Sequence, residues 1–388
     1  MPGFLRIASP FVLLSATAIT AQAQAQDLPA TPAGKEALSI LTEAVAVPTV
    51  EGRGQVPVLA EKFKARLLVA GFAASDIAFT PMGETGYLTA RYPGRDAKAR
   101  PILVIGHMDV VEAKAADWER DPFTPVVENG YVYGRGALDN KGDVAMVLAA
   151  LLKLKRSGWT PGRDVILALS GDEEIGMETT RAMAAAFKDA ELVLNSDAGG
   201  GELGEDGGPL VYSIQAGEKT YADYTLTVTD PGGHSSRPGR TNAIAGMSAA
   251  LARIAAYRFP AQVSPLTRAY WAGSAARAPA DIGAAMRALA ADPNDKAAAD
   301  TLSARPEYVG LVRTTCVPTM VAGGHAKNAL PQTATANVNC RIFPGTSRDA
   351  VMKTLAGVIG DAAVKIALDP TGGIEAPESP LRKDVMSA

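Results

Sequence analysis

Four short segments of the sequence carry side chains that can hold a metal ion, and three of them directly follow a strongly apolar run. They are His107-Met108-Asp109, the loop that ends at Asp139, Gly171-Asp172-Glu173-Glu174, and Asp197. Imidazole nitrogens and carboxylate oxygens are ligands of Zn²⁺, and neighbouring carboxylates repel one another unless a cation or a proton intervenes. The set therefore predicts a metal site in which one carboxylate could bridge two ions.

Taken singly, each segment also fits an ordinary structural role. His107 could be a hydrogen-bonded sheet residue, Asp139 a helix N-cap, the acidic pair a solvated loop and Asp197 a turn former. Their placement together favours the metal site, because ligands of open α/β sheets gather at the carboxyl ends of strands. Asp109 lies two positions after His107, so on a strand it faces the same way and can hold one ring nitrogen while the other meets a metal.

The elements that position these residues are predicted from apolar runs. The runs over 102–105, 165–170 and 192–197 are nearly continuous, as expected of strands covered on both faces. Helices are predicted between them at 143–155 and 179–188. Strands that alternate with helices predict an α/β domain with a mostly parallel sheet.

The pattern changes after about Gly217. Several later segments alternate polar and apolar residues and predict half-exposed antiparallel strands; these are 221–229, 317–322 and 333–343. Helices are predicted at 243–256 and 347–359, and the Ala-rich stretch 258–310 is helical in tendency. We therefore expect an inserted α+β module at 217–345, after which residues 364–368 would return as a strand to the first sheet.

The amino terminus predicts a cleaved secretion signal over residues 1–25. Arg6 is its one charge, an apolar stretch follows, and small residues near position 25 fit an A-x-A cleavage pattern. A periplasmic or secreted protein is expected, and an uncleaved anchor is the alternative. Export would allow Cys316 and Cys340 to pair, although two separate thiols are as compatible with the sequence.

Composition excludes several classes of protein. The 388 residues include 38 Lys and Arg against 41 Asp and Glu, a net charge of −3 without any basic block, so a nucleic-acid partner is not expected. Two cysteines exclude a disulfide framework, and three histidines mean that a metal site must rely on carboxylates. The one apolar run is short, so no stable membrane insertion is expected.

From about residue 35 onward, the sequence resembles a family of co-catalytic zinc hydrolases. The family includes aminoacylase, glutamate carboxypeptidase, acetylornithine deacetylase and succinyl-diaminopimelate desuccinylase. The resemblance is carried by GHMDVV, GRGALDNKGDVA, SGDEEIG, NSDAGG, PGGHSSRPG and GGHAKNALPQTATANVNCRIFPG, in family order. It implies a catalytic domain at 26–216 and 346–388, and a ferredoxin-like dimerisation and lid domain at 217–345.

The resemblance also implies a role for each candidate residue. Two zinc ions per subunit are expected in the full-length parent, with Co²⁺ as an alternative. Their ligands would be His107 and Asp197 on the first zinc, Glu174 on the second, and Asp139, joined to Asn140 by a cis peptide, on both. Glu173 would be the general base, and Asp109 would orient His107.

The inserted domain would supply three substrate-binding residues. His234 would reach into the active site of the partner subunit of a homodimer, while Asn328 and Arg341 would contact the substrate, often its carboxylate. The implied activity is hydrolysis of peptide or amide bonds in small substrates, dipeptides or N-acyl amino acids, by a metal-bridging hydroxide with Glu173 as base. Asp at position 197 leans toward dipeptidase or aminopeptidase members.

One departure from the family pattern bears on activity. Family members supply the last ligand of the second zinc from a His close to the carboxyl end of the catalytic domain, and no His follows His325 here. We therefore expect a C-terminally truncated chain. The alternative to an active hydrolase is a non-catalytic chain that keeps partial metal binding and dimerisation.

Overall fold

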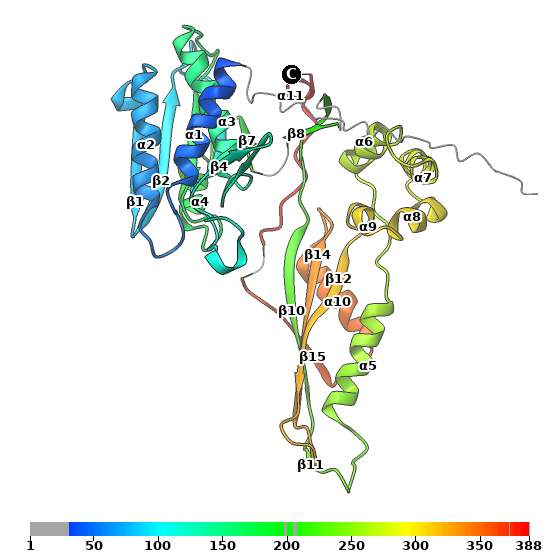
Figure 1. Cartoon of the computed structure of the whole chain (residues 1–388). Coiled ribbons are helices and arrows are strands. Elements are labelled where there is room, and N and C mark those ends of the chain that lie inside the picture. Colours follow the sequence, from blue (N-terminus) through cyan, green and yellow to red (C-terminus); the bar gives the residue numbers. More distant parts are fainter. Residues whose placement is uncertain (1–30, 198–199, 205–207, 372, 388) are drawn as a thin grey trace, which may run out of the picture. The chain divides into compact units, whose positions relative to one another are not determined.

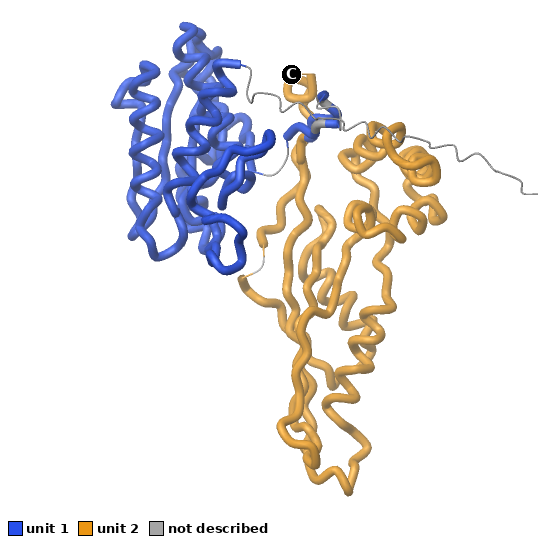
Figure 2. The backbone as a smooth tube through the Cα atoms, viewed as in Figure 1, with its two compact units in different colours: residues 1–213 blue, residues 214–388 orange. Residues whose placement is uncertain are grey.

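The computed structural model describes residues 31–197, 200–204, 208–371 and 373–387. The predicted signal over 1–25 lies outside the described residues. By its internal contacts the chain divides into two compact units, residues 1–213 and 214–388 (Figure 2). Among the described residues, no helix combines the length and the apolar character needed to cross a membrane.

A five-stranded sheet forms the centre of the first unit (Figure 1). Its strands, in spatial order, are β1 (Ile77–Met82), β2 (Thr85–Tyr92), β6 (Val165–Ser170), β3 (Ile102–His107) and β7 (Leu192–Asn195). Strands β6, β3 and β7 run parallel, and β2 and β1 are added antiparallel at the other edge. The three parallel strands are the runs that the sequence predicts as covered strands.

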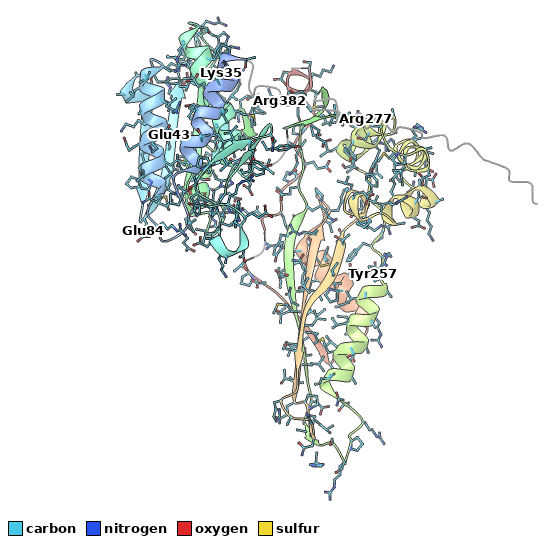
Figure 3. All side chains as sticks on the ribbon, in the orientation of Figure 1. Lys35, Glu43, Glu84, Tyr257, Arg277 and Arg382 are labelled. Atoms are coloured by element: carbon cyan, nitrogen blue, oxygen red, sulfur yellow. A yellow bond between two sulfur atoms is a disulfide. The ribbon has the colours of Figure 1, made fainter. Side chains whose placement is uncertain are left out.

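Helices cover both faces of this sheet. They are α1 (Pro32–Val45), α2 (Val56–Val69) and α3 (Lys141–Arg156) on one face and α4 (Glu178–Ala186) on the other. Leu148 and Leu152 of α3 are fully buried against Phe63 of α2 and Leu167 of β6. Each such side chain contributes about 1.5–3 kcal/mol by leaving water. Glu43 of α1 pairs with Lys62 and Arg66 of α2 at the surface (Figure 3).

Short elements link these layers. They are η1 (Ala74–Asp76), η2 (Ala115–Asp117), the hairpin of β4 (Val126–Glu128) with β5 (Tyr131–Tyr133), and the pair β8 (Gly200–Leu203) with β9 (Pro209–Ser213). Strand β1 and both hairpins were not predicted from the sequence, because their residues show neither a long apolar run nor regular alternation.

A four-stranded antiparallel sheet forms the second unit. Its strands, in spatial order, are β12 (Thr315–Gly323), β14 (Thr333–Ile342), β10 (Thr220–Thr229) and β15 (Val364–Leu368). Helices α5 (Ala243–Ala256) and α10 (Arg348–Ile359) pack on one face. Alternate residues of β10 and β14, such as Tyr224 and Val338, are buried beneath them, which confirms these two predicted half-exposed strands. The third predicted strand, β12, is present but is exposed along most of its length. A two-stranded ribbon of β11 (Gly233–His234) and β13 (Ala329–Leu330) extends this unit.

The predicted return of residues 364–368 to the first sheet was wrong. Strand β15 pairs antiparallel with β10, with Leu226 opposite Ile366. The sequence VKIAL alternates apolar and other residues, which suits a sheet covered on one face rather than the doubly covered strands of the first unit. The strand also follows α10 closely, and consecutive elements tend to pack together.

The Ala-rich stretch forms a small helical cluster of its own. After α5 ends, near Tyr257 (Figure 3), the chain builds α6 (Pro265–Ser274), α7 (Ala280–Ala291), α8 (Lys296–Ser303) and α9 (Pro306–Val312). Prolines begin α6 and α9, where the missing N–H costs nothing. Trp271 and Leu302 are fully buried in the core of this cluster.

Cys316 and Cys340 form a disulfide between paired positions of β12 and β14. The sequence left this pairing open. The bond joins the edge strand β12 to its neighbour, and the loop that it closes spans 24 positions.

We expect reduction of this disulfide to destabilise the second unit by about 3 kcal/mol, because the reduced unfolded chain regains the entropy of the open loop. Urea unfolding with and without reductant measures the difference. The double variant Cys316→Ala/Cys340→Ala should match the reduced protein and ignore reductant. Equal stability of the oxidised and reduced wild-type protein would contradict the assignment.

Candidate metal centre

The carboxyl ends of three parallel strands bring the predicted ligands to one edge of the first sheet. His107 is the last residue of β3 and pairs with Ser170 at the end of β6, while Ile105 pairs with Asn195 at the end of β7. The acidic loop after β6 and Asp197 after β7 therefore start at nearly the same level as His107. Asp139 comes from the loop that precedes α3.

His107 lies at the centre of the carboxylates. Its Nε2 atom is 2.9 Å from Oδ1 of Asp139 and 3.7 Å from Oδ2 of Asp197. The ring is almost completely buried, whereas the side chain of Asp139 is largely exposed. The imidazole is thus presented at the rim of the sheet with one nitrogen directed at two predicted ligands.

Ligand atoms of the predicted residues converge in two groups that share His107. One group contains His107, Asp139 and Glu174, and the other contains His107, Glu173 and Asp197; within each group the atoms lie within 4.8 Å of one another. The structure therefore brings together all five residues that were predicted around the two metals. The bond between Asp139 and Asn140 is a cis peptide, as the family resemblance implied.

Asp109 contacts both His107 and the acidic loop. Nδ1 of His107 lies 3.0 Å from the carbonyl oxygen of Asp109 and 3.4 Å from its carboxylate. The two carboxylate oxygens accept hydrogen bonds from the backbone N–H groups of Glu173 and Glu174, at 3.1 and 3.0 Å. Asp109 thus fixes the imidazole largely through its backbone and holds the two glutamates in place through its side chain.

The imidazole and the carboxylates of the site shift one another's pKa values. Burial raises the pKa of Glu173, Glu174 and Asp197, and neighbouring carboxylates raise it further. Burial alone would lower the pKa of His107, but its bond to Asp109 and the charges of Asp109 and Asp197 raise it to about 9. The surrounding carboxylates therefore favour the positively charged form of His107, as they would favour a cation beside it.

Three residues next to the ligands were given no role of their own in the sequence analysis. Asn140 is fully buried, and its Oδ1 accepts the backbone N–H of His107 at 3.0 Å. Lys141 is equally buried and donates to the carbonyls of Ala44 and Val47. Asp143 lies close enough that burial and the charge of Asp197 raise its pKa to about 6. These contacts join distant segments, and only the cluster DNKGD around Asp139 could have drawn attention to them.

Gly106, directly before His107, packs closely against two neighbouring side chains. A Cβ atom at this position would lie 2.7 Å from Oδ1 of Asn140 and 2.7 Å from Oγ of Ser196. Any other residue would displace the amide that holds the backbone of His107, so the close approach requires glycine.

We expect divalent cations to raise the melting temperature of the protein. An ion at about 100 times its dissociation constant stabilises the folded state by about 2.7 kcal/mol, which corresponds to about 5–10 °C for a unit of this size. Scanning fluorimetry with Zn²⁺ and with EDTA measures the shift. It should shrink as the pH falls, because protonated carboxylates do not bind cations, and it should be lost in His107→Ala. An unchanged melting temperature would contradict the metal assignment.

Two of the three predicted residues of the second unit are neighbours, and the third lies far from them along the sheet. His234 pairs with Ala329, and the carbonyl of Asn328 accepts the N–H of Ser235, so His234 and Asn328 are neighbours on the β11–β13 ribbon. Arg341 lies at the opposite end of β14, opposite Tyr221. A strand advances about 3.3 Å per residue, so Arg341 is about 26 Å along β14 from Thr333, where this strand begins near the ribbon.

Comparisons with known proteins agree on one family. Residues 103–371 match the sequence profile of Peptidase family M20/M25/M40. N-fatty-acyl-amino acid synthase/hydrolase PM20D1 of Mus musculus is 29% identical over 293 residues, which are 70% of this chain and 55% of that protein. Probable carboxypeptidase S-like 2 of Dictyostelium discoideum is 30% identical over 296 residues, 72% of this chain and 55% of that protein.

Solved structures show the same fold. The M20 family metallo-carboxypeptidase Sso-CP2 of Sulfolobus solfataricus superposes with a TM-score of 0.59 at 21% identity, over 86% of this chain and 77% of that chain. The chain spans about half the length of the curated relatives that it matches.

Proposed function

The chain belongs to Peptidase family M20/M25/M40, and on this basis we propose that it is a metal-dependent hydrolase of peptide or amide bonds in small substrates. The observation that carries the proposal is the convergence of one buried imidazole and four carboxylates at the carboxyl edge of a parallel sheet. Ligands of open α/β sheets bind at this edge. Burial and the neighbouring carboxylates raise the pKa values of Glu173 and Asp197, and a cluster of this kind favours a bound cation.

The donor set fits two divalent cations. One imidazole with several carboxylates suits Zn²⁺, and Co²⁺ has similar preferences. His107 and Asp197 would hold one ion, and Glu174 would hold the other. Asp139 would contact both ions, because its Oδ1 lies 2.9 Å from Nε2 of His107 and its ligand atom lies within 4.8 Å of that of Glu174. Such ions polarise a substrate carbonyl and make a water molecule a better nucleophile at neutral pH.

Glu173 is the proposed general base. Burial raises the pKa of this carboxylate, which makes it a better proton acceptor at neutral pH. Its backbone is held by Asp109, so its position relative to the ligands is fixed. Glu173 would take a proton from the attacking water and return it to the nitrogen of the leaving amine.

His234 is the proposed donor to the oxyanion that develops on the scissile carbonyl. The backbone N–H of Ser236 donates to Nδ1 of His234 at 3.2 Å. The hydroxyl of Ser236 also lies 2.8 Å from Nδ1, so Ser236 engages this atom and Nε2 is the ring nitrogen left to contact the substrate. Stabilisation of the developing charge by such donors is a large term in acyl transfer.

N-acyl amino acids and dipeptides are the proposed substrates. Two relatives, an N-fatty-acyl-amino acid synthase/hydrolase and a probable carboxypeptidase, are named for substrates in which an amide lies next to a free carboxylate. Arg341 is the proposed ligand for that carboxylate, and Asn328 a further substrate contact. Arginine matches a carboxylate with two parallel N–H bonds.

A homodimer through the second unit would bring these residues to one substrate. His234 and Arg341 of one protomer lie at opposite ends of β14, too far apart to touch the same small molecule. Strand β12 is an edge strand with exposed apolar side chains, Val317, Met320 and Val321, and such an edge is suited to pairing with another chain. His234 of one protomer would then act in the site of its partner.

A periplasmic or secreted location is proposed as well. The Cys316–Cys340 disulfide is typical of oxidising compartments, which supports the prediction of a signal over residues 1–25.

Hydrolysis assays on the Zn²⁺-loaded chain test the proposed function. N-acyl amino acids and dipeptides should be cleaved, and EDTA should abolish cleavage until Zn²⁺ is restored. Metal binding without any turnover would overturn the proposal in favour of a non-catalytic chain that keeps its metal site.

A further inference from the structure

Arg341 is an exposed cation that rests on an aromatic ring. Its guanidinium carbon lies 4.7 Å from the centre of the Tyr221 ring, its cross-strand partner on β10. Within the part of the chain that the structure describes, the guanidinium has no hydrogen-bond or ion-pair partner. A guanidinium stacked on a ring keeps the N–H groups at its edge available, and these form the fork that binds a carboxylate.

Tyr221 is itself held in place by a network on the same face of the sheet. Its hydroxyl donates to Oδ2 of Asp223. The other oxygen of Asp223 accepts Nδ2 of Asn337 at 2.7 Å and Nδ2 of Asn339 at 3.0 Å. Asn337 also donates to Oγ1 of Thr319 at 2.9 Å, so the network joins β10, β14 and β12. The helices α5 and α10 pack on the opposite face, and no helix of the described residues covers this one, so these bonds do not serve a core.

The charges agree with this arrangement. Burial would raise the pKa of Asp223, but hydrogen bonds from Tyr221 and the two asparagines hold it below its usual value. The bond to Asp223 raises the pKa of Tyr221, so the phenol stays protonated and donates. Nearby, burial and then the charge of Arg341 lower the pKa of Lys219 to about 8. The ammonium of Lys219 donates to the carbonyl oxygen of Arg313 and to Oγ1 of Thr315, and Asp223 offsets part of the charge of Arg341. An anionic ligand at this end of the sheet would therefore be recognised by the fork of Arg341 rather than by an excess of positive charge.

We propose that Tyr221 is a positioning residue that holds the guanidinium of Arg341 in the orientation that receives a substrate carboxylate, and that Asp223 fixes the ring. The inference rests on the proposed function, in which Arg341 binds that carboxylate. The stack on Tyr221 and the hydrogen bond to Asp223 hold Arg341 as a preorganised fork rather than as a mobile surface cation. This preorganisation would be the source of the preference for a substrate with a carboxylate.

Ligand binding tests this inference without relying on turnover. The ligands are N-dodecanoyl-L-leucine and its carboxamide, titrated by calorimetry into the full Zn²⁺-loaded chain carrying Glu173→Gln, so that neither is consumed. The measured quantity is the ratio of the two dissociation constants. In this background Tyr221→Leu should reduce the preference for the carboxylate about five-fold, and Arg341→Ala about 20-fold.

Two further variants separate positioning from general stability. Tyr221→Phe keeps the ring and loses only the tether to Asp223, so it should reduce the preference by about two-fold, less than Tyr221→Leu. An unchanged ratio would overturn the role of Asp223. Tyr270→Leu removes a similarly exposed tyrosine from α6 of the same unit and should leave the ratio unchanged. Added to Arg341→Ala, Tyr221→Leu should have no further effect, because both act on one interaction.

The outcomes distinguish this inference from the proposed function. A ratio that falls in Arg341→Ala but not in Tyr221→Leu would overturn the role of Tyr221 and leave the hydrolase proposal intact. Equal binding of carboxylate and carboxamide by the parent, or binding of neither, would overturn the inference at its base. If the unmodified chain hydrolyses neither substrate class but the carboxylate preference is present, only the hydrolase proposal would be overturned.

Discussion

Replacing Glu173 with glutamine is expected to lower kcat by about 10³-fold while the metal stays bound. The change is isosteric and removes the proton acceptor, and general base catalysis contributes about 10²–10⁴-fold. Both KM and metal content should change little, because Glu173 acts on the attacking water and is not among the proposed ligands. Initial rates on an N-acyl amino acid, together with metal analysis of the same samples, provide the measurement.

Glu84→Gln is the matched control, since Glu84 is an exposed glutamate of the first unit outside both ligand groups. It should keep full activity. Retention of more than about a tenth of the wild-type rate by Glu173→Gln would reject the base assignment. Loss of metal in that variant would instead make Glu173 a ligand, a result that its proximity to His107 and Asp197 makes worth measuring.

Replacing Asp139 with alanine is expected to remove activity to below detection, a loss of at least about 10³-fold. Asp139 is the proposed link between the two ions, so its removal weakens both sites at once. It also leaves Nε2 of His107 without its 2.9 Å partner. Metal analysis after dialysis should show that the bound ions fall from two per chain to fewer than one.

Asp143→Asn is the sharpest control for this variant. Asp143 lies in the first turn of α3, directly after the loop that carries Asp139, and accepts a hydrogen bond from Asn140. It belongs to neither ligand group. Its metal content should therefore match the wild-type protein. Two ions retained by Asp139→Ala, or metal loss caused equally by Asp143→Asn, would show that the ligands have been assigned to the wrong carboxylates.

Much of the first unit could be predicted because its signals are local. The runs at 165–170 and 192–195 are apolar enough to be recognised as covered strands, and parallel strands of this kind present their carboxyl ends at one edge. His107, Glu173, Glu174 and Asp197 follow such runs, so their convergence was predictable from position. Asp139 follows no long apolar run. It was included as the acidic residue of a glycine-rich loop before a helix, where an N-cap was the alternative, and the family resemblance added its bridging role.

Features that depend on distant partners could not be predicted. The side chain of Asp109 accepts backbone N–H groups more than sixty positions away, and nothing local indicates this. Likewise, the alternation in VKIAL indicates a strand covered on one face, but it does not identify the neighbouring strand, which the structure shows to be β10. The tether from Tyr221 to Asp223, Asn337 and Asn339 depends on the register between β10 and β14, which alternation alone leaves undetermined.

Anomalous diffraction from crystals of the Zn²⁺-loaded protein tests the central claim most directly. Data collected on either side of the zinc absorption edge should show two difference peaks within bonding distance of the predicted ligands, one beside His107 and Asp197 and one beside Glu174, with Asp139 touching both. Peaks elsewhere on the molecule, or none at the end of β3, would contradict the claim that these side chains form a metal centre.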